Sequence, residues 1–286
     1  MFETISLAGL KSMQLSDPQN FKELAKNVGK QIIGEGSEEV FTEKYRIYSV
    51  FQEEEKMKKR ALRSPFLIVK PKAYIYGQES LDLALVCERL TQEFDIDIVF
   101  TAQHVDLRMI AEKTKNIILT AQHMDGIVPG RGMGHILPEG IVDAGAQAVV
   151  LNHAEHSLTV TALGKAMARA KELNLITIVC ADTPAECEAI AQLDPDVMIC
   201  EPTSLIGTGK TSDDDYILAT TKAVRDVNPN VKILQAAGVT TGDDVYRVIK
   251  QGADASGGTS GILNAPSREG RIREMLEAIR KVNAER

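Results

Sequence analysis

Tryptophan is absent from this chain of 286 residues, aromatic residues make up only 5% of it, and there are four cysteines. None of the cysteines has a C-x-x-C spacing, which argues against a disulfide framework or a cysteine-rich metal site. Two of them lie within apolar runs. The sequence therefore predicts reduced cysteines with buried packing roles at Cys87, Cys180, Cys187 and Cys200.

Excess positive charge and long apolar runs are also absent. The formal net charge is −7, and no basic stripe with interleaved aromatic residues occurs, so a nucleic-acid partner is not expected. No run of 18 apolar residues is present, and Met1–Thr4 lacks the start of a secretory signal. We therefore expect a soluble, cytoplasmic protein with no membrane partner. An anionic ligand would need local positive charge or backbone amides.

The histidines and acidic runs do not indicate a metal site. The histidines lack a tight ligand spacing such as H-E-x-x-H and lie on different predicted loops, at His104, His123, His135, His153 and His156. The acidic runs 213–215 and 243–244 lie at expected helix starts, where negative charge suits the helix dipole. We expect no metal and no cofactor.

Short apolar runs recur along the chain, with helical periodicity between them. They predict strands at 66–70, 97–101, 117–120, 148–151, 176–180, 197–200, 231–235 and about 253–257. Eight apolar strands, each followed by a helix or loop, indicate an α/β fold of the (β/α)8-barrel type. The last run is unusually small and polar for a buried strand. A helix is expected between Leu158 and Leu173, where apolar residues repeat at three and four.

Residues 1–63 are predicted to be a helical N-terminal extension, and residues 64–286 the barrel domain. One helical face of the extension would carry Phe21, Leu24, Ala25, Val28 and Ile32. The charged run Glu53–Arg60 is typical of a solvated helix face. Because the apolar face needs a partner, we expect the extension to pack on the barrel or to mediate subunit contacts.

Charged and polar residues follow three of the predicted strands. Glu201 directly follows the run 197–200. It precedes Pro202 and a glycine-containing loop, an arrangement that suits a base beneath a movable lid. His153 follows the run 148–151, and Lys70 and Lys72 follow the first run. Each of these residues alone is more often structural or solvated. Their shared position at strand exits favours a site for proton abstraction from a small substrate.

From about residue 66 onward the chain resembles the triosephosphate isomerase family, most closely its short archaeal form. The matching segments occur in the family's order over some 220 residues: Lys72–Tyr74, Gln103–Ile110, Ala121–Asp125, Gly134–Glu139, Leu151–His156 and Glu201–Gly209. The resemblance implies a TIM barrel and a homodimer or homotetramer.

The resemblance also implies roles for single residues. Glu201 would be the base, His153 the electrophile that polarises the carbonyl, Lys72 the cation near the substrate, and Glu155 a supporting group. These roles are those established for triosephosphate isomerase and come with the resemblance. They imply aldose–ketose isomerisation of a small phosphorylated sugar through an enediolate, which a closed lid protects from water. The phosphate is expected on the amides of Gly207, Thr208, Gly209, Ala237, Gly238, Ser260 and Gly261.

Some residues differ from the family's usual pattern. Lys70 stands where an asparagine is usual and would bring a second cation to the substrate, Met133 replaces a threonine, and Ala154 replaces a serine. These differences suggest recognition of a larger or more anionic sugar phosphate than glyceraldehyde 3-phosphate, such as a tetrulose phosphate. Two alternatives are an enolising epimerase or aldol-type enzyme, and a non-catalytic sugar-phosphate-binding protein on the same barrel.

Overall fold

The computed structural model describes residues 59–285, and the part of the chain from Lys59 onward forms one compact unit. Helices predicted within residues 21–32 and in most of the run 53–60 lie outside the described residues. None of the described helices is long and apolar enough to cross a membrane. The four cysteines are free and buried, as predicted.

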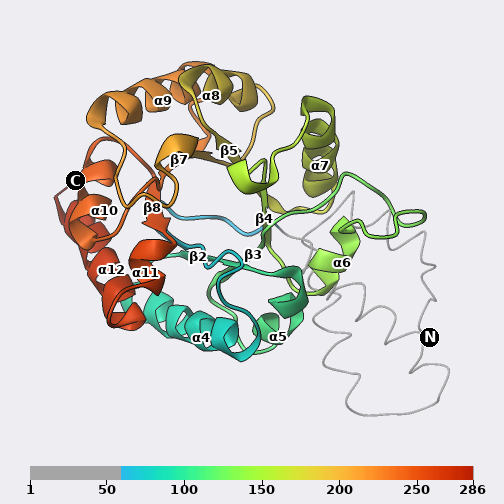
Figure 1. The fold of residues 1–286 in the computed structure, drawn as a ribbon, viewed down its shortest axis with the longest axis horizontal. Helices are drawn as coiled ribbons and strands as arrows, with labels where there is room; N and C mark the ends of the chain where they lie inside the picture. Colours follow the sequence, from blue (N-terminus) through green and yellow to red (C-terminus); the bar gives the residue numbers. More distant parts are fainter. Residues whose placement is uncertain (1–58, 286) are drawn as a thin grey trace, which may run out of the picture. The chain divides into compact units, whose positions relative to one another are not determined.

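Eight parallel strands close into a barrel in sequence order, with β1 paired to β8 (Figure 1). They are β1 Phe66–Val69, β2 Ile98–Ala102, β3 Ile118–Ala121, β4 Ala148–Leu151, β5 Ile176–Ala181, β6 Val197–Cys200, β7 Lys232–Gln235 and β8 Ala255–Gly258. The predicted TIM-barrel fold is therefore confirmed, and each strand lies within about two residues of its predicted bounds. Nearly every strand residue is buried, because one face of the sheet lines the packed interior of the barrel and the helices cover the other face.

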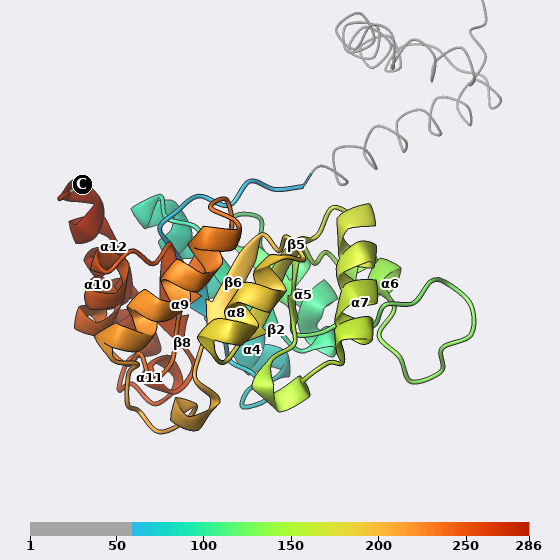
Figure 2. The ribbon, with the colours of Figure 1, turned by 90° about the horizontal axis from the view of Figure 1, so that it is seen from above.

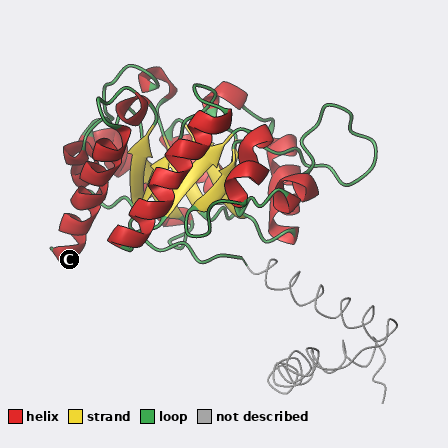
Figure 3. Ribbon diagram, turned by 90° about the horizontal axis from the view of Figure 1, so that it is seen from below, coloured by secondary structure: helices red, strands yellow, loops and turns green. Residues whose placement is uncertain are grey.

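Helices surround the barrel (Figure 3). They are α4 Gly77–Phe94, α5 Leu107–Ala111, α6 Pro138–Asp143, α7 Val160–Glu172, α8 Pro184–Ala191, α9 Asp214–Val227, α10 Gly242–Lys250, α11 Ser260–Leu263 and α12 Arg268–Ala284. Asp213 caps α9, and Thr241 forms a capping box with Asp244 at α10, which confirms both predicted helix starts. Helix α7 begins two residues after Leu158, because the Thr159 side chain caps it.

Strand β8 is small and polar because it lies very close to β1. Gly257 has a φ of +143°, and a Cβ atom at this position would lie 2.0 Å from the carbonyl oxygen of Ile68. Only glycine fits such an approach without displacing the backbone. The close contact explains why the sequence of β8 lacks the apolar character of the other strands.

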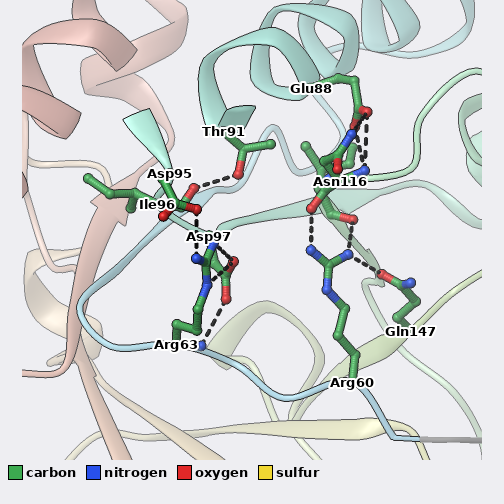
Figure 4. A network of polar contacts seen from close by, with 10 residues as sticks. Arg60, Arg63, Glu88, Thr91, Asp95, Ile96, Asp97, Asn116 and Gln147 are labelled. Atoms are coloured by element: carbon green, nitrogen blue, oxygen red, sulfur yellow. Dashed lines mark hydrogen bonds and ion pairs between the residues drawn. The ribbon is translucent and has the colours of Figure 1, made fainter. Parts of the chain in front are cut away.

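The segment before β1 seals the amino-terminal end of the barrel. Arg60 donates to the carbonyl oxygens of Asn116 and Ile117, and Arg63 binds the buried carboxylate of Asp97 (Figure 4). Leu62 packs against the apolar cluster inside the barrel. Lys59 and Arg60 are not helical, so the end of the charged run does not form the predicted solvated helix face.

Candidate active site

The predicted catalytic residues, and Lys70, which was predicted to bind the substrate, lie together at the carboxyl-terminal ends of the strands. Lys70 and Lys72 follow β1, His153 follows β4, and Glu201 follows β6. In (β/α)8 barrels this end carries the chemistry, because the loops after all eight strands meet there. Figure 2 shows the segment after Lys59, in blue, at the opposite end of the barrel from α11.

Two ion pairs organise the site. Lys70 Nζ lies 3.2 Å from Glu201 Oε2, and both side chains are almost fully buried. Lys72 Nζ lies 2.7 Å from Glu155 Oε1, which is more than half exposed. The site therefore brings two ammonium groups next to two carboxylates, and the predicted residues Lys70, Lys72, Glu155 and Glu201 are all part of it.

His153 is held as a neutral imidazole. Its Nδ1 accepts a hydrogen bond of 3.1 Å from the backbone N–H of Glu155, so the ring proton is placed on Nε2. Nε2 is buried, has no hydrogen-bond partner, and lies 4.0 Å from Glu201 Oε2. Burial, reinforced by the ammonium groups of Lys70 and Lys72, lowers the pKa of His153 to about 4. The histidine can therefore donate a hydrogen bond from Nε2 to a bound ligand.

Glu201 is a buried carboxylate kept in its charged form. Burial alone would raise its pKa, but the ammonium groups of Lys70 and Lys72 oppose that effect, and the pKa lies below the usual value for glutamate. A charged carboxylate shielded from water is suited to accept a proton from a bound carbon acid.

Two glutamines fix the backbone that carries Lys72. Lys72 has a φ of +51°, a left-handed conformation that is uncommon outside glycine. Its carbonyl oxygen accepts hydrogen bonds from Gln122 Nε2 at 3.0 Å and from Gln103 Nε2 at 3.5 Å. Strained backbone of this kind often marks functional sites. Both glutamines lie in segments that match the family, but their sequence context did not indicate this role.

Asn152 is a further residue whose role the sequence did not indicate. Its Nδ2 donates to the Cys180 carbonyl oxygen at 3.0 Å, and its Oδ1 accepts from the Leu158 N–H at 2.9 Å. Asn152 thus ties the loop that carries His153 to the neighbouring strand β5. Its own φ of +58° suits asparagine, which tolerates the left-handed region.

The glycine-rich segments after β6, β7 and β8 approach one another closely. A Cβ atom on Gly238 would lie 1.9 Å from the Lys210 carbonyl oxygen, and one on Gly261 would lie 2.8 Å from the Val239 carbonyl oxygen. Ala237 is buried beside them. The predicted lid residues Gly207, Thr208 and Gly209 are exposed instead, and the Thr208 hydroxyl donates to Leu205 within the same loop.

A cavity of about 480 Å³ adjoins the reactive groups. His153 and Glu201 line it together with Cys180, Asp182 and Ile206. Because Ile206 belongs to the loop after β6, the predicted lid forms part of the cavity wall. Within residues 59–285, no group of three or more His, Cys, Asp or Glu side chains is arranged to hold a metal ion.

The fold and the candidate site define the class: a (β/α)8-barrel protein with paired acid–base groups at the carboxyl-terminal ends of its strands. Comparison with known proteins identifies the family. The family model described as triosephosphate isomerase matches residues 65–267. The chain belongs to the triosephosphate isomerase family, whose members are intramolecular oxidoreductases.

Archaeal triosephosphate isomerases are among its relatives. The enzyme of Methanocaldococcus jannaschii is 37% identical over 206 residues, which cover 71% of this chain and 94% of the relative. The enzyme of Caldivirga maquilingensis is 36% identical over 223 residues, with 76% and 99% covered. The enzyme of Sulfolobus acidocaldarius is 32% identical over 220 residues, with 76% and 95% covered. The predicted resemblance to the archaeal form is confirmed.

Proposed function

We propose that the protein interconverts a ketose phosphate and an aldose phosphate, with triose phosphates as the first candidate substrates. Family membership supports this reaction class. The observation that carries the assignment to this site is the buried Glu201 carboxylate, which lies 4.0 Å from a histidine nitrogen that has no other partner.

In the proposed reaction Glu201 removes a proton from the carbon next to the substrate carbonyl. The C–H electron pair forms the C=C bond of an enediolate, and the carbonyl π pair moves to oxygen, where His153 Nε2–H stabilises it. His153 gives its Nε2 proton to this oxygen and takes the proton of the neighbouring hydroxyl group, so the negative charge moves to that second oxygen. Glu201 then returns its proton to the former carbonyl carbon through the C=C electron pair, as an electron pair of the second oxygen forms the new C=O bond. Lys72 supplies positive charge near the substrate, and Glu155 positions Lys72 through their 2.7 Å ion pair.

The phosphate group would be bound by backbone amides at the loops after β6, β7 and β8. The close packing of Gly238 against Lys210, and of Gly261 against Val239, supports a common binding position. In this proposal Gly207, Thr208 and Gly209 move toward the phosphate when the lid closes, and Ala237 and Ser260 complete the binding site. Closure would exclude water from the enediolate, which otherwise decomposes.

A tetrulose phosphate is the second candidate substrate. The cavity of about 480 Å³ beside His153 and Glu201 offers room beyond the reacting carbons. This room favours a substrate that is larger than a triose. The reaction steps at Glu201 and His153 would be unchanged.

The test is isomerisation and solvent-deuterium uptake by the full chain with dihydroxyacetone phosphate and the erythrulose phosphates. Glu201→Gln keeps the side-chain shape but removes the base, so exchange should fall by about three orders of magnitude or more. Glu188→Gln, an exposed residue on α8, is the matched control. Exchange that persists in Glu201→Gln contradicts the assigned base. Binding of a sugar phosphate without exchange would favour a non-catalytic binding protein, and an epimer or aldol product would favour the other alternative.

A further inference from the structure

Lys70 occupies an unusual position for a lysine. Its side chain is about 5% exposed and lies at the carboxyl-terminal end of β1, where the barrel interior opens into the candidate site. Within the described part of the chain, Lys70 is the only side chain that donates a hydrogen bond to Glu201. Burying an ammonium group is unfavourable unless a partner compensates for the lost hydration.

The backbone at this position does not depend on the side chain. The Lys70 N–H donates to the Gly258 carbonyl oxygen at 3.1 Å, which continues the pairing of β1 with β8. An uncharged side chain would therefore leave the strand in place. Buried ion pairs contribute little net stability compared with apolar residues of similar volume, so stability alone gives no reason for a lysine here.

We propose that Lys70 is a positioning residue that holds the Glu201 carboxylate ready for proton abstraction and keeps the charge of the site balanced while the proton is transferred. This inference rests on the proposed isomerase function. Before the reaction, Lys70 compensates the negative charge of Glu201. When Glu201 accepts the proton it becomes neutral, and the negative charge moves to the enediolate oxygen.

The charge moves only a short distance. Glu201 Oε2 lies 3.2 Å from Lys70 Nζ and 4.0 Å from His153 Nε2, the atom proposed to face the substrate oxygen. The Lys70 ammonium therefore contacts the carboxylate where the negative charge starts, and that carboxylate lies next to the atom proposed to face the charge at its end position. A fixed charge in a site shielded from water stabilises such an intermediate without reorganisation.

Lys70 also affects the proposed electrophile. After burial, the nearby Lys70 ammonium is the largest influence that lowers the pKa of His153, and it acts against protonation of the imidazole. Lys70 consequently helps to keep both members of the reacting pair in the required forms, a charged carboxylate and a neutral imidazole.

The test compares Lys70→Gln and Lys70→Met with the wild-type full chain. Glutamine removes the charge but retains a hydrogen-bond donor, whereas methionine removes both. Lys113→Gln, at an exposed lysine after α5, is the control for loss of a positive charge elsewhere. We expect kcat to fall roughly tenfold to hundredfold in both Lys70 variants, with a smaller change in KM. The acid limb of the pH–rate profile should move to higher pH, because Glu201 loses its compensating cation.

A second readout does not need activity. NMR titration of His153 in the folded variants should show its pKa above the wild-type value, and Lys113→Gln should leave it unchanged. The charge-balance proposal is overturned if Lys70→Gln keeps the wild-type acid limb and the wild-type His153 titration. It is also overturned if both variants fail to fold, since the role of Lys70 would then be structural. Wild-type protein without isomerase activity would instead contradict the proposed function, and the titration would still decide whether Lys70 sets the charge state of the site.

Discussion

The N–H of Glu155 donates a hydrogen bond of 3.1 Å to Nδ1 of His153, and this contact decides what the imidazole can do. With Nδ1 acting as an acceptor, the single proton of the neutral ring lies on Nε2 and faces the site. The short 3-10 helix Ala154–His156 places this N–H at its start, so this single turn of backbone orients the histidine.

The first prediction concerns the titration of His153. Its pKa of about 4 lies below the ordinary value of about 6.5, so the folded state binds fewer protons than the unfolded state between these values. This contribution to stability is fully present above about pH 6.5 and is lost as the pH falls toward 4. NMR should show a neutral imidazole at pH 6, and His153→Asn should lower turnover by about two orders of magnitude or more.

Activity measurements can separate the titration of His153 from the titration of the substrate's phosphate group. A phosphate monoester titrates near pH 6, which affects kcat/KM for wild type and variants alike. Once kcat/KM is corrected for the titration of the phosphate group, its pH dependence should show no loss of activity with a pKa near 6.5 in the free enzyme. If NMR shows His153 half-protonated near pH 6.5, the neutral form and the role assigned to it are wrong.

Gly238 gives a prediction about the loops after β6 and β7. Its φ is +61°, and a Cβ atom there would lie 1.9 Å from the Lys210 carbonyl oxygen. Gly238→Ala should separate the two loops and misplace the proposed phosphate amides, lowering kcat/KM roughly a hundredfold. Gly164→Ala is the control, since a Cβ at this helical position meets nothing within 4 Å. Equal kinetics for the two variants would argue against a phosphate site at these loops.

The fold followed from the sequence because continuous apolar runs are a direct consequence of burial on both faces of a parallel sheet. Strand β8 was the least clear, since the close approach of Gly257 to Ile68 replaces apolar side chains with backbone contact. The site residues at strand ends were also predictable in position. Their pairing was not: that Lys70 contacts Glu201 while Lys72 contacts Glu155 depends on side-chain directions that no spacing in the sequence records.

A third prediction concerns association of subunits, which the family resemblance leads us to propose. The segment between β3 and α6 projects away from the barrel (Figure 2), and Met133 on it is fully exposed. Tyr74, Tyr76 and Val105 are further exposed apolar side chains in the loops after β1 and β2. We propose that Met133 enters a neighbouring subunit, so Met133→Asp should dissociate a homodimer or homotetramer.

Analytical ultracentrifugation of the full chain tests this proposal. Leu218→Asp, an exposed leucine on α9, is the matched control and should leave the assembly unchanged. A wild-type protein that sediments as a monomer, or a Met133→Asp variant with unchanged mass, would rule out this contact.

The last prediction concerns the ion pair that anchors the segment before β1. Asp97 is only 3% exposed, and Arg63 binds its Oδ1 through both Nε, at 3.1 Å, and Nη2, at 2.8 Å. The Arg63 N–H also donates to Asp97 Oδ2 at 2.8 Å, and substitution of the side chain leaves that bond available. Because the guanidinium is partly exposed, Arg63→Ala should lower the free energy of unfolding by about 1–2 kcal/mol. Arg63→Lys keeps the charge but not the two hydrogen bonds to Oδ1, and its free energy of unfolding should fall by less than that of Arg63→Ala.

Urea denaturation of both variants, with Arg131→Ala in an exposed loop as the control, measures the difference in the free energy of unfolding. Isomerase activity should be retained, because the pair lies at the opposite end of the barrel from Glu201. A full loss of activity with unchanged stability would mean that this end of the barrel acts on the site in a way the ion pair does not explain.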